Sequence, residues 1–359
     1  MNSFKKILRY IAMYGFRRTL VKVLYRTDLA PAYFILKALY SNKRKSDKRI
    51  AFIGMGNHGF TLLAFFVAVI AKQRISLVID PSSKSKKLSK KVLSSKHYDD
   101  IESAILDKEF YGDIVYIASD HFSHTDHARI SSKYFKNIYV EKPLFVDFEQ
   151  MKIYKDILSG DCNIYTGFNR PYSAFFKDFI SIIDRNFSIT MIVNGHFLPA
   201  DHWYRNKDQG SRVLGNMTHW IDLSLHIFNK YGADNLKIEL SSGKLDDLVL
   251  IMSSSAGKIC ISFSANSEPS DGVEEYLFWN CPSSNGNIIN FRKIYYVTQD
   301  GFIKRKSRLA KDAGHKLASL APLNGSIEDG QISYKSSALA LKVEEMYVDG
   351  VNESSFNLN

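Results

Sequence analysis

The sequence predicts an α/β fold: a domain built on a doubly wound parallel sheet, followed by an α+β domain with a mostly antiparallel sheet. Three observations predict it. Apolar runs alternate with helical patterns over residues 49–158, a glycine-rich turn follows the first run, and strand-like runs dominate after residue 187. Strands that alternate with helices form parallel sheets with right-handed crossovers, whereas successive strands joined by short turns form antiparallel sheets.

The glycine-rich turn lies between an expected buried strand and an expected helix. Residues 49–60 read Arg-Ile-Ala-Phe-Ile-Gly-Met-Gly-Asn-His-Gly-Phe. Gly54 allows a turn where a side chain would clash, Gly56 lets the backbone approach a pyrophosphate, and Gly59 lets the helix pack closely on the strand. This is typical of a dinucleotide-binding Rossmann domain, with the phosphates at the helix N-terminus. The residues expected to bind them are Gly54, Gly56, Asn57, His58 and Gly59.

An acidic residue closes the second apolar run. Asp80 lies 21 residues past Gly59. An acid near this spacing binds the ribose hydroxyls of a dinucleotide, and its charge repels the 2′-phosphate of NADP. We therefore expect NAD as the cofactor. NADP stays the alternative because three lysines follow closely, Lys84, Lys86 and Lys87.

Composition bounds the class of protein. The 359 residues, 45% of them hydrophobic, suffice for two domains with large cores. The three cysteines are too few and too scattered for a disulfide framework or a zinc ribbon. No apolar run is long enough to cross a bilayer, and the N-terminus lacks the pattern of a signal peptide. We therefore expect a cytoplasmic protein.

The positive charge is concentrated in an N-terminal arm. Residues 1–48 hold 12 Lys and Arg against Asp28 and Asp47, a net charge of +10 out of +11 for the whole chain. The nearly neutral body argues against nucleic-acid binding. The arm has helical periodicity, which leaves two uses open: contact with an anionic membrane at its inner face, or packing on the body or a partner subunit. In either case we expect residues 2–46 to be dispensable for the cofactor site, with residues 41–48 as a linker.

The second half of the chain changes pattern after residues 163–168. A helix is expected over 173–185, a hairpin turn at 255–258, and a final helix over 333–347. The expected strands are 188–197, 236–241, 248–254, 258–265, 276–280 and 288–298. The domains predicted are a basic amphipathic arm (1–48), a dinucleotide-binding domain (49–165), an α+β substrate and oligomerisation domain (166–332), and a C-terminal helix and tail (333–359). We expect a homo-oligomer formed through the C-terminal sheet.

Ligands of doubly wound sheets bind beyond the carboxyl ends of the strands. In this chain those ends carry Gly54, Asp80, Ser119 with Asp120, and Glu141 with Lys142. Three histidines nearby, His121, His124 and His127, raise the question of a metal. Side chains six positions apart on a helix point in different directions, and no Cys or paired acid completes a ligand set. We therefore expect no metal site.

The chain resembles the Gfo/Idh/MocA oxidoreductases, named after glucose-fructose oxidoreductase and inositol dehydrogenase. The resemblance covers roughly residues 49–352 and rests on the glycine turn and four further stretches. These are Ser119-Asp-His-Phe-Ser-His124, Val140-Glu-Lys-Pro-Leu-Phe145, Gly167-Phe-Asn-Arg-Pro-Tyr172, and the stretch from Gly210 to Asp222 that contains Thr-His-Trp-Ile-Asp. It implies that Ser119, His124, Glu141 and Lys142 contact the cofactor, with the Glu-Lys-Pro beside the nicotinamide.

Lys142 suits proton transfer physically. An ammonium beside a cationic nicotinamide, and partly desolvated, gives up its proton readily, so it can take the hydroxyl proton as hydride leaves the carbon. The resemblance makes His219 a second partner of that hydroxyl and Asp222 its neighbour, three residues on and on the same helix face. Many family members have an acid four residues before this histidine, where this chain has Gly215.

The expected substrate residues combine an aromatic surface with hydrogen-bonding groups. They are Asn169, Arg170, Tyr172, Trp203, Arg205 and Asn216. An aromatic face suits a sugar ring, and a forked Arg suits carboxylate or phosphate. The sequence thus favours an NAD(P)-dependent sugar or nucleotide-sugar oxidoreductase, as in relatives that serve bacterial surface polysaccharide synthesis. The alternative is a weakly catalytic protein that binds a nucleotide sugar or a membrane complex, which Gly215 and the arm favour.

Overall fold

The chain folds into two compact units. The computed structural model describes residues 3–358, apart from 42–46, 244–245, 268, 270–271, 309–310, 312 and 326–329. One unit, which we name the Rossmann unit, comprises Tyr14–Gly167 and His315–Gly330. The other, the sheet unit, comprises Met1–Met13, Phe168–Gly314 and Gln331–Asn359.

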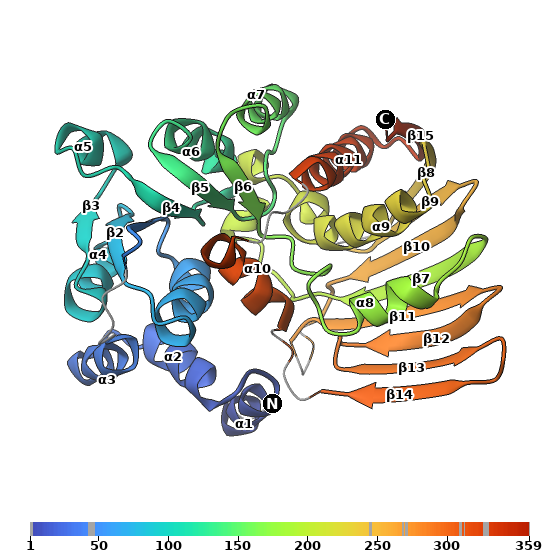
Figure 1. Ribbon diagram of the computed structural model, residues 1–359, viewed down its shortest axis with the longest axis horizontal. Coiled ribbons are helices and arrows are strands. Elements are labelled where there is room, and N and C mark those ends of the chain that lie inside the picture. The colour runs from blue at the N-terminus through green and yellow to red at the C-terminus, as the bar shows by residue number, and fades with distance from the viewer. Residues whose placement is uncertain are drawn as a thin grey trace. The chain divides into compact units, whose positions relative to one another are not determined.

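The Rossmann unit is built on a six-stranded parallel sheet with the order β3-β2-β1-β4-β5-β6 (Figure 1). Its strands are β1 Ile50–Ile53, β2 Ile75–Ile79, β3 Lys96–Tyr98, β4 Gly112–Ile117, β5 Phe135–Val140 and β6 Asn163–Thr166. Its connecting helices are η1 Gly59–Ile70, α4 Ser83–Leu88, η2 Ser89–Leu93, α5 Ile101–Leu106, η3 His121–Ser123, α6 His124–Ser131 and α7 Phe148–Leu158. The order reverses beside β1, which confirms the predicted doubly wound sheet.

Helix η1, which follows the glycine turn, is buried almost all round. Its sequence from Gly59 to Ile70 contains no charged residue, and only the last two positions are not buried. A helix that is apolar on every side needs cover on every side. The sheet covers one side, and the N-terminal helices supply the rest.

The arm contains α1 Ser3–Tyr14, α2 Phe16–Arg26 and α3 Ala30–Tyr40, and the last two contact η1. Val21, Leu36 and Tyr40 are buried in the core of the Rossmann unit. The Tyr40 hydroxyl donates a hydrogen bond to the carbonyl oxygen of Phe60 at 2.9 Å, and the two rings stack at 4.8 Å. The apolar sides of α2 and α3 therefore pack on the Rossmann unit. That residues 2–46 are dispensable for the cofactor site stays a prediction.

Two further predictions concern the arm and its surroundings. Most of the expected linker at residues 41–48 lies outside the described residues, since 42–46 are not described. Among the helices that are described, none has the length and apolar character that crossing a bilayer requires.

The sheet unit carries a nine-stranded sheet with the order β14-β13-β12-β11-β7-β10-β9-β8-β15. All its neighbouring strands are antiparallel except β7 and β10, which confirms the mostly antiparallel second sheet. The strands are β7 Phe187–Asn194, β8 Asn235–Ser242, β9 Leu248–Ser254, β10 Gly257–Ser264, β11 Glu274–Cys281, β12 Ser284–Ile289, β13 Lys293–Thr298, β14 Ile303–Ser307 and β15 Glu353–Asn357. The helices are α8 Phe176–Ile182, η4 Trp203–Arg205, η5 Lys207–Gln209, η6 Val213–Met217, α9 Thr218–Lys230 and α11 Gly330–Asp349.

One face of this sheet packs on helices. Phe179 of α8 meets Trp279 of β11 at 5.1 Å between ring centroids, and Phe228 of α9 meets Phe187 of β7 at 5.6 Å. Burial alternates along β7 and β10, as expected for strands with one covered face. The predicted hairpin turn is also confirmed, because Ser254 pairs with Gly257 around it.

The predicted single strand 288–298 is wrong: β12 and β13 form a hairpin there. The turn between them has no glycine, but Asn290 and Phe291 both adopt left-handed backbone angles, with φ of 52° and 49°. Tight hairpin turns need such angles, and in a sequence such turns are normally indicated by glycine or by Asn-Gly pairs. Strands β3, β14 and β15, helix α5 and helix α10 (Ala313–Asn324) were also not predicted.

Candidate active site

The glycine turn has the geometry that a dinucleotide needs. Gly54 has a φ of +85°, and a Cβ there would lie 2.5 Å from the backbone of Ala118. A Cβ on Gly59 would lie 2.4 Å from the carbonyl oxygen of Gly54, so these two glycines allow β1, β4 and η1 to meet. A Cβ on Gly56 would meet nothing within 4 Å. The backbone at Gly56, Asn57 and His58 is therefore open to a phosphate at the start of η1.

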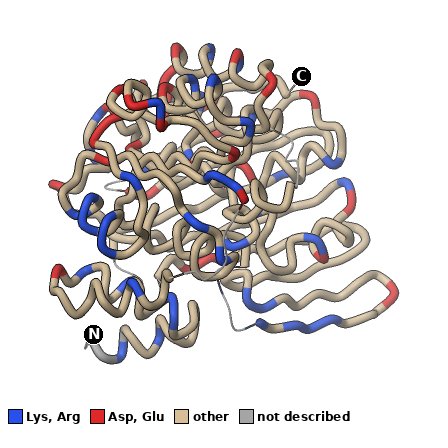
Figure 2. Tube along the Cα trace, turned by 60° about the vertical axis from the view of Figure 1, so that its left-hand side comes forward, with Lys and Arg blue, Asp and Glu red and all other residues tan. Residues whose placement is uncertain are grey.

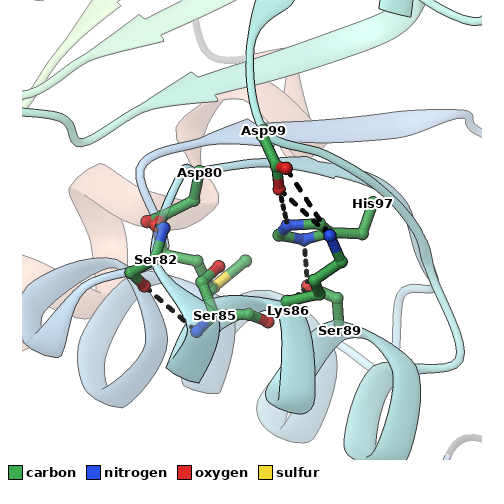
Figure 3. A network of polar contacts seen from close by, with 8 residues as sticks. Asp80, Ser82, Ser85, Lys86, Ser89, His97 and Asp99 are labelled. Carbon is green, nitrogen blue, oxygen red and sulfur yellow. Dashed lines mark hydrogen bonds and ion pairs between the residues drawn. The ribbon is translucent and has the colours of Figure 1, made fainter.

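Asp80 joins this turn to the end of β2 (Figure 3). Its Oδ2 accepts a hydrogen bond from the N–H of Met55 at 2.6 Å, and its Oδ1 accepts one from the N–H of Ser82 at 2.8 Å. The residue is 9% exposed. Each carboxylate oxygen accepts more than one hydrogen bond, so Asp80 can also accept from the two hydroxyls of a ribose.

The lysines after Asp80 are all engaged within the Rossmann unit. Lys84 Nζ lies 4.0 Å from the ring centroid of Tyr25 in α2, and Lys87 Nζ lies 2.8 Å from Asp28. Figure 3 shows Lys86 beside Asp99, with 3.5 Å between Nζ and the carboxylate. Each of the three ammonium groups thus has a partner within the Rossmann unit, and the side chains of Lys86 and Lys87 are exposed.

Asp99 also contacts a histidine in the same network. His97 Nε2 lies 3.3 Å from Asp99 Oδ1, and its Nδ1 lies 3.2 Å from Ser89 Oγ. Burial lowers the pKa of His97, although Asp99 opposes that shift. These contacts hold the end of β3 against helices α4 and η2, next to Asp80.

Glu141 stands just past the carboxyl end of β5 and is buried. It is 6% exposed, and its Oε1 lies 3.0 Å from His58 Nε2 and 3.0 Å from the Tyr139 hydroxyl. Burial raises the pKa of Glu141, but the His58 ring, Lys142 and Tyr139 outweigh burial and leave that pKa below its usual value. A Cβ on Gly167 would lie 2.4 Å from Glu141 Oε2, so the glycine that ends β6 makes room for this carboxylate.

Lys142 follows Glu141 directly and is half-buried. The peptide bond from Lys142 to Pro143 is cis. His124 holds this segment, because its Nδ1 lies 2.7 Å from the Pro143 carbonyl oxygen and its Nε2 lies 3.3 Å from the Ser119 carbonyl oxygen. The structure therefore links His124 and Ser119 to the Lys142 loop.

Ser119 has a second contact, between its Oγ and His127 Nδ1 at 2.9 Å. Burial, with help from the neighbouring His124, lowers the pKa of His127 to about 4. Among the described residues, no group of three His, Cys, Asp or Glu side chains is arranged to hold a metal ion.

The sheet unit carries the second set of predicted residues. Asn216 lies in η6 and His219 lies one residue into α9, which follows it directly. The His219 ring meets the Phe168 ring edge-on at 6.4 Å. The Oδ1 atom of Asn216 is buried and has no hydrogen-bond partner within the described part of the chain.

Asp222 is fully buried and serves as a link between helices. Its Oδ1 accepts a hydrogen bond from the Ser336 hydroxyl of α11 at 2.8 Å, and His226 Nε2 lies 3.8 Å away. Sequence reasoning missed a similar link: Glu344 of α11 accepts hydrogen bonds from the N–H and the hydroxyl of Ser211, just before η6. Burial raises the pKa of Glu344. The contacts of Asp222 and Glu344 hold helices η6 and α9 against α11, and α9 carries His219.

The two arginines expected to bind substrate have protein partners. Arg170 Nη2 lies 2.6 Å from Glu275 Oε1, and its side chain is 11% exposed. Arg205 donates to both carboxylate oxygens of Asp246, at 3.0 and 3.3 Å, and to two carbonyl oxygens. That either guanidinium also binds a carboxylate or phosphate of a substrate stays a prediction. Glu275 and Asp246 lie far away in the sequence, and no local signal announced them.

The remaining predicted residues differ in exposure. Asn169 is 1% exposed and accepts a hydrogen bond from Arg170, whereas Tyr172 is half-buried. Trp203 is 43% exposed and packs edge-on against Tyr204 at 4.4 Å. The His202 ring stacks near the Trp203 ring, with 6.0 Å between their centroids.

Comparison with known proteins gives the family of the first domain. Residues 48–166 match the model of the Gfo/Idh/MocA oxidoreductase family, described as an NAD-binding Rossmann fold. The chain carries a Gfo/Idh/MocA NAD-binding domain. This confirms the resemblance predicted from the sequence, and it confirms NAD as the cofactor type. No match was found among curated proteins.

Solved structures extend the likeness of fold to the sheet unit. A dehydrogenase (MviM) from Clostridium difficile is 17% identical, with a TM-score of 0.67 over 85% of this chain and 100% of that chain. A myo-inositol dehydrogenase from Corynebacterium glutamicum is 15% identical, with a TM-score of 0.67 over 86% and 98%. GenD2 from gentamicin A biosynthesis, solved in complex with NAD, is 13% identical, with a TM-score of 0.69 over 88% and 99%. At these identities the likeness shows the shared two-domain fold.

Proposed function

We propose that this Gfo/Idh/MocA protein transfers hydride between NAD and a hydroxyl or ketone of a sugar or nucleotide sugar. The observation that carries the proposal is the Glu141-Lys142 pair at the carboxyl end of β5, held by contacts with His58, Tyr139 and His124. Support for a sugar-like substrate comes from the solved myo-inositol dehydrogenase and GenD2 of the same fold. A role in surface polysaccharide synthesis belongs to the same proposal.

The residues present fit NAD. Gly56 leaves the backbone open, the start of η1 faces the same turn, and Asp80 keeps acceptor capacity for ribose hydroxyls. When bound, NAD supplies the hydride acceptor. NADP fits less well because Lys84, Lys86 and Lys87 are engaged by Tyr25, Asp99 and Asp28.

In the direction of oxidation, the amine of Lys142 takes the proton of the substrate hydroxyl while hydride leaves the same carbon, and a carbonyl forms. In the direction of reduction, the ammonium returns that proton. His219 orients the hydroxyl in this proposal, and Asn216 offers its amide oxygen to a second hydroxyl. Trp203 offers its face to the sugar ring.

The experiment is to follow NAD reduction across a panel of nucleotide sugars, free sugars and inositols. The proposal expects NAD reduction with at least one compound of the panel, and no NAD reduction when no such compound is added. The alternative function, a weakly catalytic nucleotide-sugar-binding protein, is favoured by Gly215 at the place of the usual acid. Saturable binding of a nucleotide sugar without any NAD reduction would favour that alternative.

We also propose a homo-oligomer formed through the uncovered face of the nine-stranded sheet. That face carries Ile192 and Phe278, which are 38% and 41% exposed, together with Ile251 and Cys260 on neighbouring strands. Large apolar side chains exposed on a sheet face are typical of a subunit interface. Light scattering of the parent and of an Ile192→Asp variant tests it, with a smaller particle expected for the variant. Since NAD and nucleotide sugars are cytoplasmic metabolites, we place the reaction in the cytoplasm.

A further inference from the structure

Helix α3 is apolar on two opposite faces. One face, with Tyr33, Leu36 and Tyr40, is buried in the core of the Rossmann unit. The other face is exposed and consists of Ala30, Pro31, Phe34, Ile35 and Ala38. Phe34 is 77% exposed and Ile35 is 41% exposed. A helix that is apolar all round is normally covered all round, so this second face calls for a partner.

The exposed apolar surface extends beyond α3. Leu29, which precedes the helix, is 65% exposed. In α2, which contacts α3, Phe16 and Val23 are 63% and 36% exposed and lie seven residues apart, on one helix side. Isolated exposed apolar side chains are common, but a whole helix face with large neighbours marks an interaction surface. We name Leu29, Ala30, Pro31, Phe34, Ile35 and Ala38 the outer face of α3.

The surroundings of this face are basic. Arg17, Arg26 and Lys37 are exposed on α2 and α3, and Figure 2 shows Lys and Arg along the N-terminal helices. The one acid between residues 16 and 40 is Asp28, whose carboxylate is paired with Lys87 at 2.8 Å. Helix η2, which α3 contacts, adds Lys91, whose Nζ lies 5.5 Å from the centroid of the Tyr33 ring. A partner of this surface must therefore tolerate apolar insertion and carry negative charge.

We propose that the outer face of α3 docks on the surface of an anionic lipid bilayer. Apolar side chains then enter the boundary between headgroups and acyl chains, and the lysines and arginines lie near lipid phosphates. In α2, Val21 is fully buried in the core of the Rossmann unit and Leu24 packs against that core. The docking residues are thus the ones left outside, and the proposal is independent of catalysis.

The experiment measures binding of the full chain to sedimented vesicles of phosphatidylglycerol and phosphatidylcholine, with pure phosphatidylcholine as reference. The proposal expects binding to the anionic vesicles that weakens as salt rises. Phe34→Asp should lower the partition coefficient at least about tenfold. The variant lacks an aromatic side chain that would be buried in the bilayer, and it gains a negative charge that anionic lipids repel. Lys37→Glu should lower it about fivefold or more.

Matched variants separate the outer face from general surface effects. Leu106→Asp changes an apolar side chain of α5 that is 81% exposed, and Lys133→Glu changes an exposed lysine outside the arm. Both should bind vesicles like the parent. All four variants should keep the parent's NAD affinity and melting temperature, which shows that they fold.

Two outcomes would overturn the proposal. One is a full chain that ignores anionic vesicles, or a Phe34→Asp variant that binds them as the parent does. The other is a parent that forms dimers in light scattering, loses them on Phe34→Asp and ignores vesicles. That second result would assign the outer face of α3 to another copy of the chain.

Discussion

His58 Nε2 lies 3.0 Å from Glu141 Oε1, which joins the glycine turn to the end of strand β5. The turn that faces a pyrophosphate and the acid that precedes Lys142 are therefore coupled by one contact. Burial alone would raise the pKa of Glu141, and the His58 ring is the largest effect that opposes it. His58 thus acts as a positioning residue: it keeps Glu141 ionised and fixes the turn.

Removing this contact should change the pH profile. In His58→Ala the pKa of Glu141 should rise, so Glu141 becomes protonated at a higher pH. As the pH is lowered, activity should therefore begin to fall at a higher pH than in the parent. The measurement is kcat/KM against pH, with His58→Gln as the matched variant that keeps a side-chain hydrogen-bond donor near Glu141. A purely structural role would lower activity equally at all pH values and leave the acid limb in place.

The cofactor preference depends on Asp80. The parent should bind NAD more tightly than NADP, because Asp80 repels a 2′-phosphate and the nearby lysines are already engaged. Asp80→Ser should weaken NAD binding by about tenfold to a hundredfold, since hydrogen bonds to a carboxylate contribute about 1.5–3 kcal/mol each. Titration of both dinucleotides decides it. Tighter binding of NADP by the parent would sink the account of Asp80.

The arm should stabilise the Rossmann unit. Leu36→Ala leaves a cavity in the core of that unit and should cost about 2–5 kcal/mol of unfolding free energy. Tyr40→Phe removes a hydrogen bond to Phe60 and should cost about 1 kcal/mol. Ile35→Ala, on the exposed side of the same helix, should change little. Denaturant melts compare the three, and equal stability of Leu36→Ala and the parent would show that the arm does not contribute.

His127 should make the protein sensitive to acid. Its pKa is lowered to about 4 in the folded chain, from an ordinary value of 6.5. The unfolded chain therefore takes up this proton first as the pH falls, so the stability that depends on neutral His127 is complete above about pH 6.5 and is lost toward pH 4. His127→Gln should flatten the fall of melting temperature over that range. If the melting temperatures of variant and parent fall in parallel as the pH is lowered, His127 is not a source of the acid sensitivity.

The parallel half of the fold could be predicted because its strands are continuous apolar runs and its glycines are needed at fixed places. Gly54 and Gly59 would each clash if they carried a side chain, so the sequence announces the turn. The hairpin of β12 and β13 could not be predicted, because its left-handed residues are Asn290 and Phe291 and no glycine stands between them.

The site was predictable in part for a related reason. Residues at the ends of parallel strands, such as Asp80 and Glu141, follow from strand boundaries alone. The pairing of Arg205 with Asp246 depends on residues 41 positions apart, and Asp222 meets a serine 114 positions away. Such contacts form only when the sheet unit is assembled, so residue type alone does not reveal them.

The central claim is that Lys142 exchanges a proton with the substrate hydroxyl. The measurement that tests it most directly is the turnover of Lys142→Met with the substrate found in the NAD-reduction panel, beside its NAD affinity. Lys136→Met serves as the control, because Lys136 is an exposed lysine of strand β5, which ends just before Glu141 and Lys142. The account predicts unchanged NAD binding and a kcat lower by about 10² to 10⁴-fold for Lys142→Met alone. Turnover at the parent rate by Lys142→Met would contradict it.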